Sequence, residues 1–264
     1  MVIDAGPEFR KSGQAQCAFT VPEVLAVVAI IAIILSMLLP TMTAAKERAR
    51  AVICASNEKQ IGIGIRSYAV QNKQYYPVGV NPGSGDWLWM AILREEVSTM
   101  DLFYCPSTPE TTRWVRRSNP GAPSHPTGWK KDEYRLGPGR GNSFSYGMNV
   151  WGAPCCADAY GTGTYYNHAT LGERKMNSLA APDRFIVLGD SNWETATGGD
   201  ADWSAFIGMY AARQYPRETH QGTANILRGD GHVDQAPRSK LVTFSADAEI
   251  LKQWHRDNLP HWPL

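Results

Sequence analysis

Hydrophobic and polar positions are unevenly distributed along the chain, and the sharpest contrast lies near its start. From Val24 to Ala45 the sequence carries 22 uncharged residues, most of them apolar. A helix of 22 residues rises ~33 Å, enough to cross a hydrocarbon layer of about 30 Å. A secretory signal usually has a shorter apolar region, and a buried core helix is usually amphipathic. We therefore predict a membrane-spanning helix in this segment.

Beyond the apolar segment, the pattern becomes that of an amphipathic helix. Ile61, Ile65 and Tyr68 recur at the spacing of one helical face, and such a stripe can pack on a sheet. The helix is expected to continue from Thr41 to about Val70, although two glycines weaken its last turns. Proline and glycine in the following segment then end it.

The rest of the chain predicts short elements joined by loops. Residues 105–178 are dense in Gly, Pro and Asn and show few periodic runs, which favours loops and short strands. Three other segments carry clearer signals of strands or helices. They are a short helix over 85–97 with Asp86 as N-cap, a strand at "RFIVLGD" (184–190), and a hairpin at "ANILRGDGHVDQ" with its turn at 229–231. A C-terminal helix is expected at "SADAEILKQWHRD" (245–257).

Charge and composition narrow the function classes. The formal net charge is +1, so the chain lacks the strongly basic balance of a nucleic-acid-binding protein, and no nucleic-acid partner is expected. The sequence has 24 Gly and 17 Pro, most of them outside the apolar segment. This distribution is typical of one membrane helix followed by a loop-rich globular domain.

The N-terminal segment resembles a known family. The stretch "AFTVPEVLAVVAIIAIILSMLLPTMTAAKERAR" resembles the cleavage and methylation segment of type IV pilins and type II secretion pseudopilins. In that family a leader is cut before a Phe, Glu is the fifth mature residue and a Pro follows about twenty positions on. With Phe19 as the first mature residue, Glu23 is the fifth and Pro40 the twenty-second. Ala18 stands where the family usually has Gly, and Pro22 replaces an aliphatic residue.

The resemblance implies both a fold and a domain organisation. The fold is α+β and pilin-like: a long N-terminal helix packed on an antiparallel sheet, with long loops. Residues 1–18 would be the leader, residues 19–45 the transmembrane and assembly helix, and residues 46–264 a globular domain in the periplasm or at the cell surface.

The orientation in the membrane follows from the resemblance alone. Arg10 and Lys11 precede the apolar segment, whereas three basic residues follow it within a few positions, so the basic count favours an outside N-terminus. Cytoplasmic cleavage between Ala18 and Phe19 implies the opposite. The expected protein crosses the inner membrane once, with its N-terminus inside.

Glu23 is the one carboxylate at the mouth of the apolar segment. An unpaired carboxylate in hydrocarbon is unfavourable and requires a partner. By the resemblance, Glu23 would neutralise the amine of Phe19 on a neighbouring subunit and set the register of assembly. The alternative is an interfacial Glu that ends the membrane span among the lipid headgroups.

A second resemblance lies towards the C-terminus. His220, nine intervening residues and then Asp230-Gly231 form the H-x9-D-G signature of proteins associated with prepilin-type processing. The segments "RARAVICASNEKQIG", "FYCPS", "SYGMN" and "RFIVLGD" are also similar to recurring segments of that group. The chain therefore resembles a pseudopilin with an enlarged soluble domain.

The five cysteines are Cys17, Cys54, Cys105, Cys155 and Cys156. Removal of the leader would leave four of them, which allow three connectivities, and disulfides suit a domain outside the cytoplasm. The family resemblance favours a bond between Cys54 and Cys105. The chain has no Cys-x2-Cys spacing, and this argues against a zinc site with cysteine ligands.

Asp190, His220, Asp230 and His232 are the residues most suited to chemistry. Carboxylates suit Ca²⁺, for which Asp190 and Asp230 are the candidate ligands, whereas histidine suits Zn²⁺. The structural alternative, which we favour, is that His220 and Asp230-Gly231 hold a hairpin through turn hydrogen bonds.

The expected function is that of a non-enzymatic pilin or pseudopilin subunit. Its implied partners are the prepilin peptidase and N-methyltransferase, other pilin or pseudopilin subunits, the inner-membrane assembly platform and membrane lipid. The alternative is a membrane-tethered protein that binds a polymer or glycan, since exposed Trp and Tyr could form a binding face. A tethered hydrolase would require Ser191 and His220 to act together.

Overall fold

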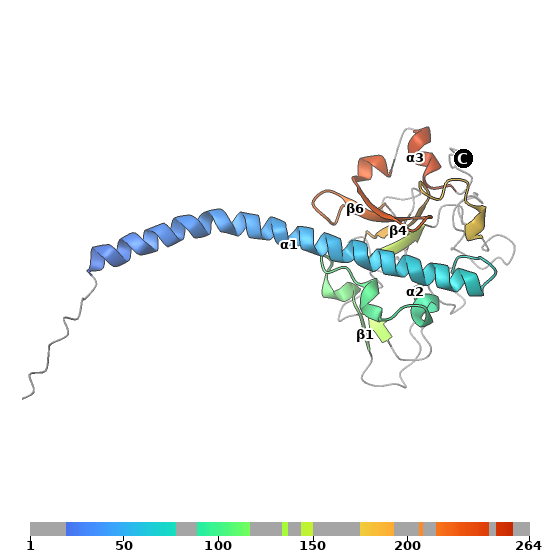
Figure 1. Cartoon of the computed structure of the whole chain (residues 1–264), viewed down its shortest axis with the longest axis horizontal. Coiled ribbons are helices and arrows are strands. Elements are labelled where there is room, and N and C mark those ends of the chain that lie inside the picture. The colour runs from blue at the N-terminus through green and yellow to red at the C-terminus, as the bar shows by residue number, and fades with distance from the viewer. Residues whose placement is uncertain are drawn as a thin grey trace, which may run out of the picture. The chain divides into compact units, whose positions relative to one another are not determined.

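The computed structural model describes residues 20–77, 89–116, 134–136, 144–149, 175–192, 206–207, 215–242 and 247–255. The chain forms two compact units, of which the first ends at Ala45 and the second begins at Lys46. This boundary falls inside the first helix, α1 (Val21–Gln71) (Figure 1). The two units are described separately.

In the first unit, α1 presents apolar side chains all around its circumference. The most apolar stretch of the helix is not buried at all, and the helix is long and apolar enough to cross a membrane. Hydroxyl groups of Ser36, Thr41 and Thr43 donate to helix carbonyls one turn back, at 2.7, 2.8 and 3.1 Å. Such internal bonds satisfy polar groups that hydrocarbon cannot. The helix continues through Pro40, whose nitrogen has no hydrogen to donate to the preceding turn.

The second unit is built on a five-stranded sheet with the order β5-β3-β4-β6-β7. The four strands β3, β4, β6 and β7 pair antiparallel, whereas the short β5 pairs parallel with β3. Gly189 lies at the centre of the register, opposite Gly147 on one side and Ile226 on the other. The strands are β3 (Tyr146–Asn149), β4 (Ile186–Asp190), β5 (Phe206–Ile207), β6 (Ala224–Arg228) and β7 (Val233–Ala236).

Short elements surround this sheet. A separate antiparallel pair consists of β1 (Trp114–Arg116) and β2 (Tyr134–Leu136). The helix α3 (Ala248–Lys252) begins at Asp247, whose side chain accepts hydrogen bonds from the first turn and caps it. The other helices within the described residues are α2 (Trp89–Ile92) and the 3₁₀ turns η1 (Leu93–Glu95), η2 (Met100–Phe103), η3 (Glu110–Thr112), η5 (Met176–Ser178) and η9 (Arg238–Lys240).

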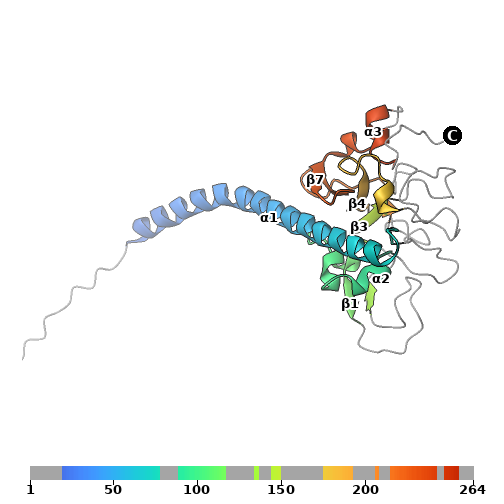
Figure 2. The same ribbon diagram turned by 45° about the vertical axis from the view of Figure 1, so that its right-hand side comes forward.

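The second half of α1 packs on the sheet along one face. A Cβ atom on Gly62 would lie 2.9 Å from Leu227 Cδ1, and one on Gly64 would lie 2.9 Å from Val97 Cγ1. The two glycines therefore allow the helix to approach β6 and the segment after η1 closely. The helix lies between β4 and β6 on one side and α2 and β1 on the other (Figures 1 and 2). Its buried residues are Ala51, Cys54, Glu58, Ile61, Gly62, Gly64, Ile65 and Ala69.

Hydrophobic residues fill both faces of the sheet. Along β6, Leu227 joins the cluster that contains Ile61 and Ile65 of α1, whereas Ile226 joins the cluster beneath α3 with Trp254. This alternation is the period of two expected of a strand. A sheet buried on both faces explains why the strand "RFIVLGD" reads as a continuous apolar run instead of an alternating one.

The structure confirms the α+β fold, a long helix packed on an antiparallel sheet. It also confirms the strand at β4, the hairpin of β6 and β7, and the C-terminal helix at α3, although α3 is shorter than its sequence signal. The helix predicted over 85–97 begins within the described residues at Trp89 and turns into 3₁₀ geometry at Leu93. Its proposed cap, Asp86, lies outside the described residues, as does most of 105–178.

The helix-to-sheet contact allows a test with two residues of one type. Ile65 is 1% exposed and Ile63 is 60% exposed on the opposite side of α1. We expect Ile65→Ala to lower the free energy of unfolding by about 2–5 kcal/mol through the cavity it leaves. Ile63→Ala changes the same side chain in the same helix and should stay within about 0.5 kcal/mol of the parent. Chemical denaturation followed by near-UV circular dichroism measures both, and equal losses would contradict the packing described.

Candidate functional site

Glu23 forms a capping box at the start of α1. The backbone N–H and the hydroxyl of Thr20 donate to Glu23 Oε2 at 2.8 and 2.7 Å. A Thr followed three residues later by Glu is the sequence signature of this cap. Glu23 therefore has a local partner in the single chain, which the family resemblance alone did not reveal. Ala18 and Phe19 lie outside the described residues.

In the second unit, a disulfide joins α1 to the segment that follows η2. Cys54 and Cys105 are fully buried, their Cα atoms lie 5.3 Å apart, and 51 positions separate them in sequence. This is the pairing that the family resemblance implied. Next to it, Asn57 Nδ2 donates to the Tyr104 carbonyl at 3.0 Å. The other three cysteines, Cys17, Cys155 and Cys156, lie outside the described residues.

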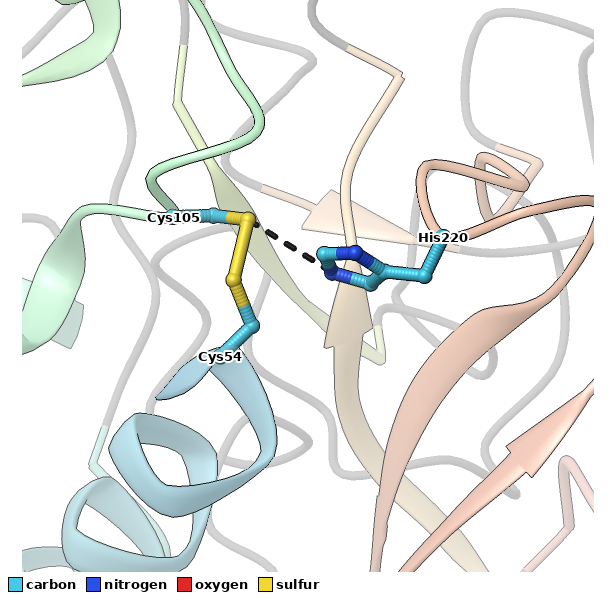
Figure 3. Close-up of side chains that lie close together, drawn as sticks. All are labelled: Cys54, Cys105 and His220. Carbon is cyan, nitrogen blue, oxygen red and sulfur yellow. Dashed lines mark hydrogen bonds between the residues drawn. A yellow bond between two sulfur atoms is a disulfide. The ribbon is translucent and has the colours of Figure 1, made fainter. Parts of the chain in front are cut away.

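His220, in the turn before β6, points at this disulfide (Figure 3). Its backbone forms a tight two-way bridge with Thr223, which fixes the turn before β6. Its buried ring places Nε2 3.5 Å from Cys105 Sγ and also 3.5 Å from Asp190 Oδ2. Burial lowers the pKa of His220 and so favours the neutral ring.

Two buried carboxyl groups, on Asp190 and Glu58, form one cluster with Cys54, Cys105 and His220. Asp190, at the end of β4, accepts a hydrogen bond from Asn225 N at 2.8 Å through Oδ2. Burial raises the pKa of Asp190 to about 8. Burial also raises the pKa of Glu58 well above its usual range, with added repulsion from Asp190 and Asp234. Three of their oxygens have no hydrogen-bond partner among the described residues: both oxygens of Glu58, and Oδ1 of Asp190.

A groove of about 420 Å³ borders this cluster at His220. One wall is the α1 stretch from Glu47 to Val52, and the other is the turn that carries His220 and Thr223. His220 is thus both a buried neighbour of the disulfide and part of the groove lining. A small molecule or an ion can approach the cluster from this side.

Asp230 and Gly231 form the turn at the opposite end of β6. Asp230 Oδ1 accepts hydrogen bonds from the backbone N–H of His232 at 3.0 Å and faces its Nδ1 at 2.6 Å. Gly231 has φ of +89°, which favours glycine. The turn also holds α1, because Lys59 Nζ donates to the Gly231 carbonyl and Arg66 Nη2 donates to the Gly229 carbonyl at 3.4 Å.

The structure does not bring the two proposed calcium ligands together. Asp190 bonds Asn225 near the start of β6, whereas the Asp230 backbone bonds Pro182 beyond the end of that strand. The intervening strand keeps the two carboxylates too far apart to share one ion, because calcium ligands lie about 2.3–2.6 Å from the metal. His232 lies with Asp230 and is likewise remote from His220.

The H-x9-D-G signature therefore fastens both ends of β6 to one helix. His220 meets the disulfide at Cys105, whose partner Cys54 lies on α1, and the Asp230-Gly231 turn meets Lys59 and Arg66, farther along α1. Between these ends, Asn225 Nδ2 donates to the Ala51 carbonyl of α1 at 3.2 Å. The nine intervening residues are the turn 221–223, the strand β6 and Gly229. The contacts of Asp230 and Gly231 agree with the interpretation that the motif holds a hairpin. His220 has a separate place inside the cluster.

Sequence reasoning missed Glu58, although the pattern contained a signal. Cys54, Glu58, Ile61 and Ile65 follow one another at helical spacings of three or four, so the acid falls on the buried stripe. A carboxylate on an otherwise apolar face is unusual enough to mark a site.

The hydroxyl that a hydrolase would require, on Ser191, is fully buried.

Comparisons of the chain with protein-family models, with curated proteins and with solved structures found no match.

The two buried carboxyl groups predict an unusual pH dependence. The folded chain keeps a proton on Asp190 up to about pH 8, whereas the unfolded chain releases it near pH 4. The contribution of this group to the free energy of unfolding is therefore greatest below pH 4 and falls as pH rises to 8. One such group changes the free energy by at most ~1.4 kcal/mol per pH unit.

Asp190→Asn and Glu58→Gln should each flatten this slope between pH 5 and 8, measured by denaturation of the oxidised chain in EDTA. Asp183→Asn removes an exposed carboxylate and serves as the control, with the parental slope retained. A parental slope in both cluster variants would show that the buried groups ionise in the same way in the folded and unfolded chains.

Proposed function

We propose that the chain is a non-enzymatic pilin-like or pseudopilin-like subunit that assembles through its N-terminal helix. The observation that carries this proposal is the change of surface along α1. Up to Met42 its large apolar side chains are exposed, and from Ala51 onwards one face is buried against a folded domain. An apolar surface of this size requires lipid or other helices to cover it.

The proposed life cycle has two stages. The chain first crosses the inner membrane once through residues 19–45, with its N-terminus inside and residues 46–264 in the periplasm or at the cell surface. The prepilin peptidase and N-methyltransferase then cut between Ala18 and Phe19, and the assembly platform inserts the subunit into a type II secretion pseudopilus or a type IV pilus-like fibre. In the fibre, neighbouring helices replace lipid around the apolar segment.

The proposed role of Glu23 is compatible with its capping box. Thr20 occupies Oε2 of Glu23 through two hydrogen bonds from neutral donors, which bring no positive charge to the carboxylate. A neighbouring subunit's Phe19 amine would be attracted by this charge in the low dielectric of the fibre core. The cap would then orient the carboxylate before assembly.

Three attachments hold the second half of α1 to the globular domain. A disulfide, the Asn225 bond and the Lys59 contact together fix the helix to β6 and to the segment after η2. A subunit pulled by its helix would carry the whole domain with it, because these attachments resist sliding of α1 along the sheet.

The alternative is a membrane-tethered protein that binds a polymer or glycan. An aromatic binding face would favour it, but Trp89, Trp254 and Tyr76, which lie in described parts of the chain, are buried in the two cores. Crosslinking between single cysteines placed on the apolar segment separates the two proposals. Assembly predicts adducts between helices of neighbouring subunits, and a lone tether predicts none.

Cleavage can be tested directly on the mature N-terminus. Mass spectrometry of the chain from membranes with active prepilin peptidase should find an N-methylated Phe19, and a peptidase-deficient strain should retain Met1. Ala18→Gly, which restores the usual residue of the family, should cleave at least as completely as the parent. An intact Met1 in the presence of active peptidase would contradict the proposal.

The charge of Glu23 can be separated from its capping function. Glu23→Gln keeps an oxygen that can accept from Thr20 but removes the negative charge, so it should be cleaved normally and enter fibres at least about tenfold less, as expected for the loss of a few kcal/mol. Thr20→Val weakens the cap and leaves the charge, and it should assemble nearly as the parent does. Ser36→Ala is the control for a polar change within the same apolar segment. Quantitative immunoblotting of sheared fibres measures all three, and full incorporation of Glu23→Gln would exclude the amine-pairing role.

A further inference from the structure

The cluster around the disulfide contains the atoms of a metal site. The sulfur atoms of Cys54 and Cys105 and a ring nitrogen of His220 all lie within 4.8 Å of one another (Figure 3). All three residues are buried. We propose that these three side chains bind Zn²⁺ when the disulfide is reduced, with Asp190 as the fourth ligand. This inference is independent of the proposed function.

The distances within the cluster fit tetrahedral zinc. Zn–N, Zn–O and Zn–S bonds of about 2.0–2.3 Å place neighbouring ligand atoms about 3.3–3.8 Å apart. His220 Nε2 lies 3.5 Å from Cys105 Sγ and 3.5 Å from Asp190 Oδ2. A single N–H cannot point at both atoms, and 3.5 Å is long for a nitrogen-to-oxygen hydrogen bond. A metal ion bound by the two sulfurs and Nε2 would lie among these atoms, with Asp190 Oδ2 beside Nε2 as the nearest further oxygen.

Polar atoms next to the proposed ligand atoms lack partners as well. His220 Nδ1, Asp190 Oδ1 and both oxygens of Glu58 have no hydrogen-bond partner among the described residues. Buried polar atoms without partners are rare in folded proteins and call for an explanation by a ligand or a function. Asn225 N holds Asp190 Oδ2 at 2.8 Å and would orient the carboxylate, as outer-shell donors do in zinc proteins.

The redox step balances with a dithiol as the reductant. A dithiol transfers two electrons and two protons to the Cys54–Cys105 bond, gives two thiols and becomes a disulfide itself. Zn²⁺ then displaces the two thiol protons and binds the thiolates. The reverse sequence releases zinc and restores the disulfide. Both states fasten α1 to the segment after η2, one by a covalent bond and the other through the metal.

The groove supplies a path to this site. Its walls carry Glu47 and Arg48, of opposite charge, and His220, the ligand that connects the groove with the sulfurs. The cytoplasm keeps thiols reduced, and oxidation follows in an oxidising compartment. A chain would thus hold α1 by zinc before oxidation and by the disulfide afterwards.

The test uses Co²⁺ as a spectroscopic substitute for Zn²⁺ on the full chain in detergent micelles. Cys17, Cys155 and Cys156 are replaced by Ser, so that any thiolate signal comes from the pair in the cluster. The reduced chain should bind one equivalent of Co²⁺ with thiolate-to-cobalt charge-transfer absorption and tetrahedral visible bands, and Zn²⁺ should displace the cobalt. The oxidised chain should give neither absorption.

Variants then assign the remaining ligands. His220→Gln and Asp190→Asn should each weaken Co²⁺ binding by at least about tenfold. His232→Gln changes an exposed histidine at the far end of β6 and should bind as the parent does.

Near-UV circular dichroism checks folding throughout. If the reduced chain loses its signal without metal, the proposal requires that Zn²⁺ restores it. Reduced chains that give no thiolate signature, with or without that signal, would overturn the proposal. Equal cobalt affinity in the parent and in a folded His220→Gln variant would overturn the assignment as well.

Discussion

The close packing of α1 against β6 is the contact on which the rest of the second unit depends. Leu227 occupies the space that a side chain at Gly62 would fill, and Ile61 and Ile65 extend the contact into the main hydrophobic cluster. The part of α1 in the second unit begins at Lys46 and ends at Gln71. In proteins, most of the stability of a helix comes from packing of its buried face and not from its own helix propensity. The sheet gains equally, since without α1 one of its faces would be exposed to water.

Within this apolar contact lies a cluster that hydrophobic packing does not require. A buried carboxyl group is unfavourable compared with an apolar side chain of similar size, and the cluster contains two, Glu58 and Asp190. Their neighbours are a neutral histidine and a disulfide instead of a fixed cation. The cluster therefore has the composition of a chemical site, because nothing in the packing explains why acids occupy these positions.

The sequence predicted those parts of the fold that local patterns determine. Helical spacing, a β-branched run and a Gly-Asp-Gly turn were sufficient for α1, β4 and the hairpin. The cluster was harder to predict, because its members come from four separate segments and meet only in the folded chain. The missing Cys-x2-Cys spacing argued against cysteine ligands, yet the fold brings Cys54 and Cys105 together across 51 positions. The calcium pair of Asp190 and Asp230 shows the converse, since the two aspartates belong to different sequence segments and the strand β6 lies between them.

The position of the cluster on α1 also matters for how the helix can work. Cys54 lies near the start of the buried face, which runs from Ala51 to Ala69. A force applied to the exposed, apolar part of α1 reaches the attachments at Ala51 and Cys54 before it reaches Ile61 or the Lys59 contact. A noncovalent contact at that point would be the first to open, because each such contact contributes only about 0.5–1.5 kcal/mol. A covalent bond or a metal ion at Cys54 is therefore best placed to keep the helix from peeling away from the sheet.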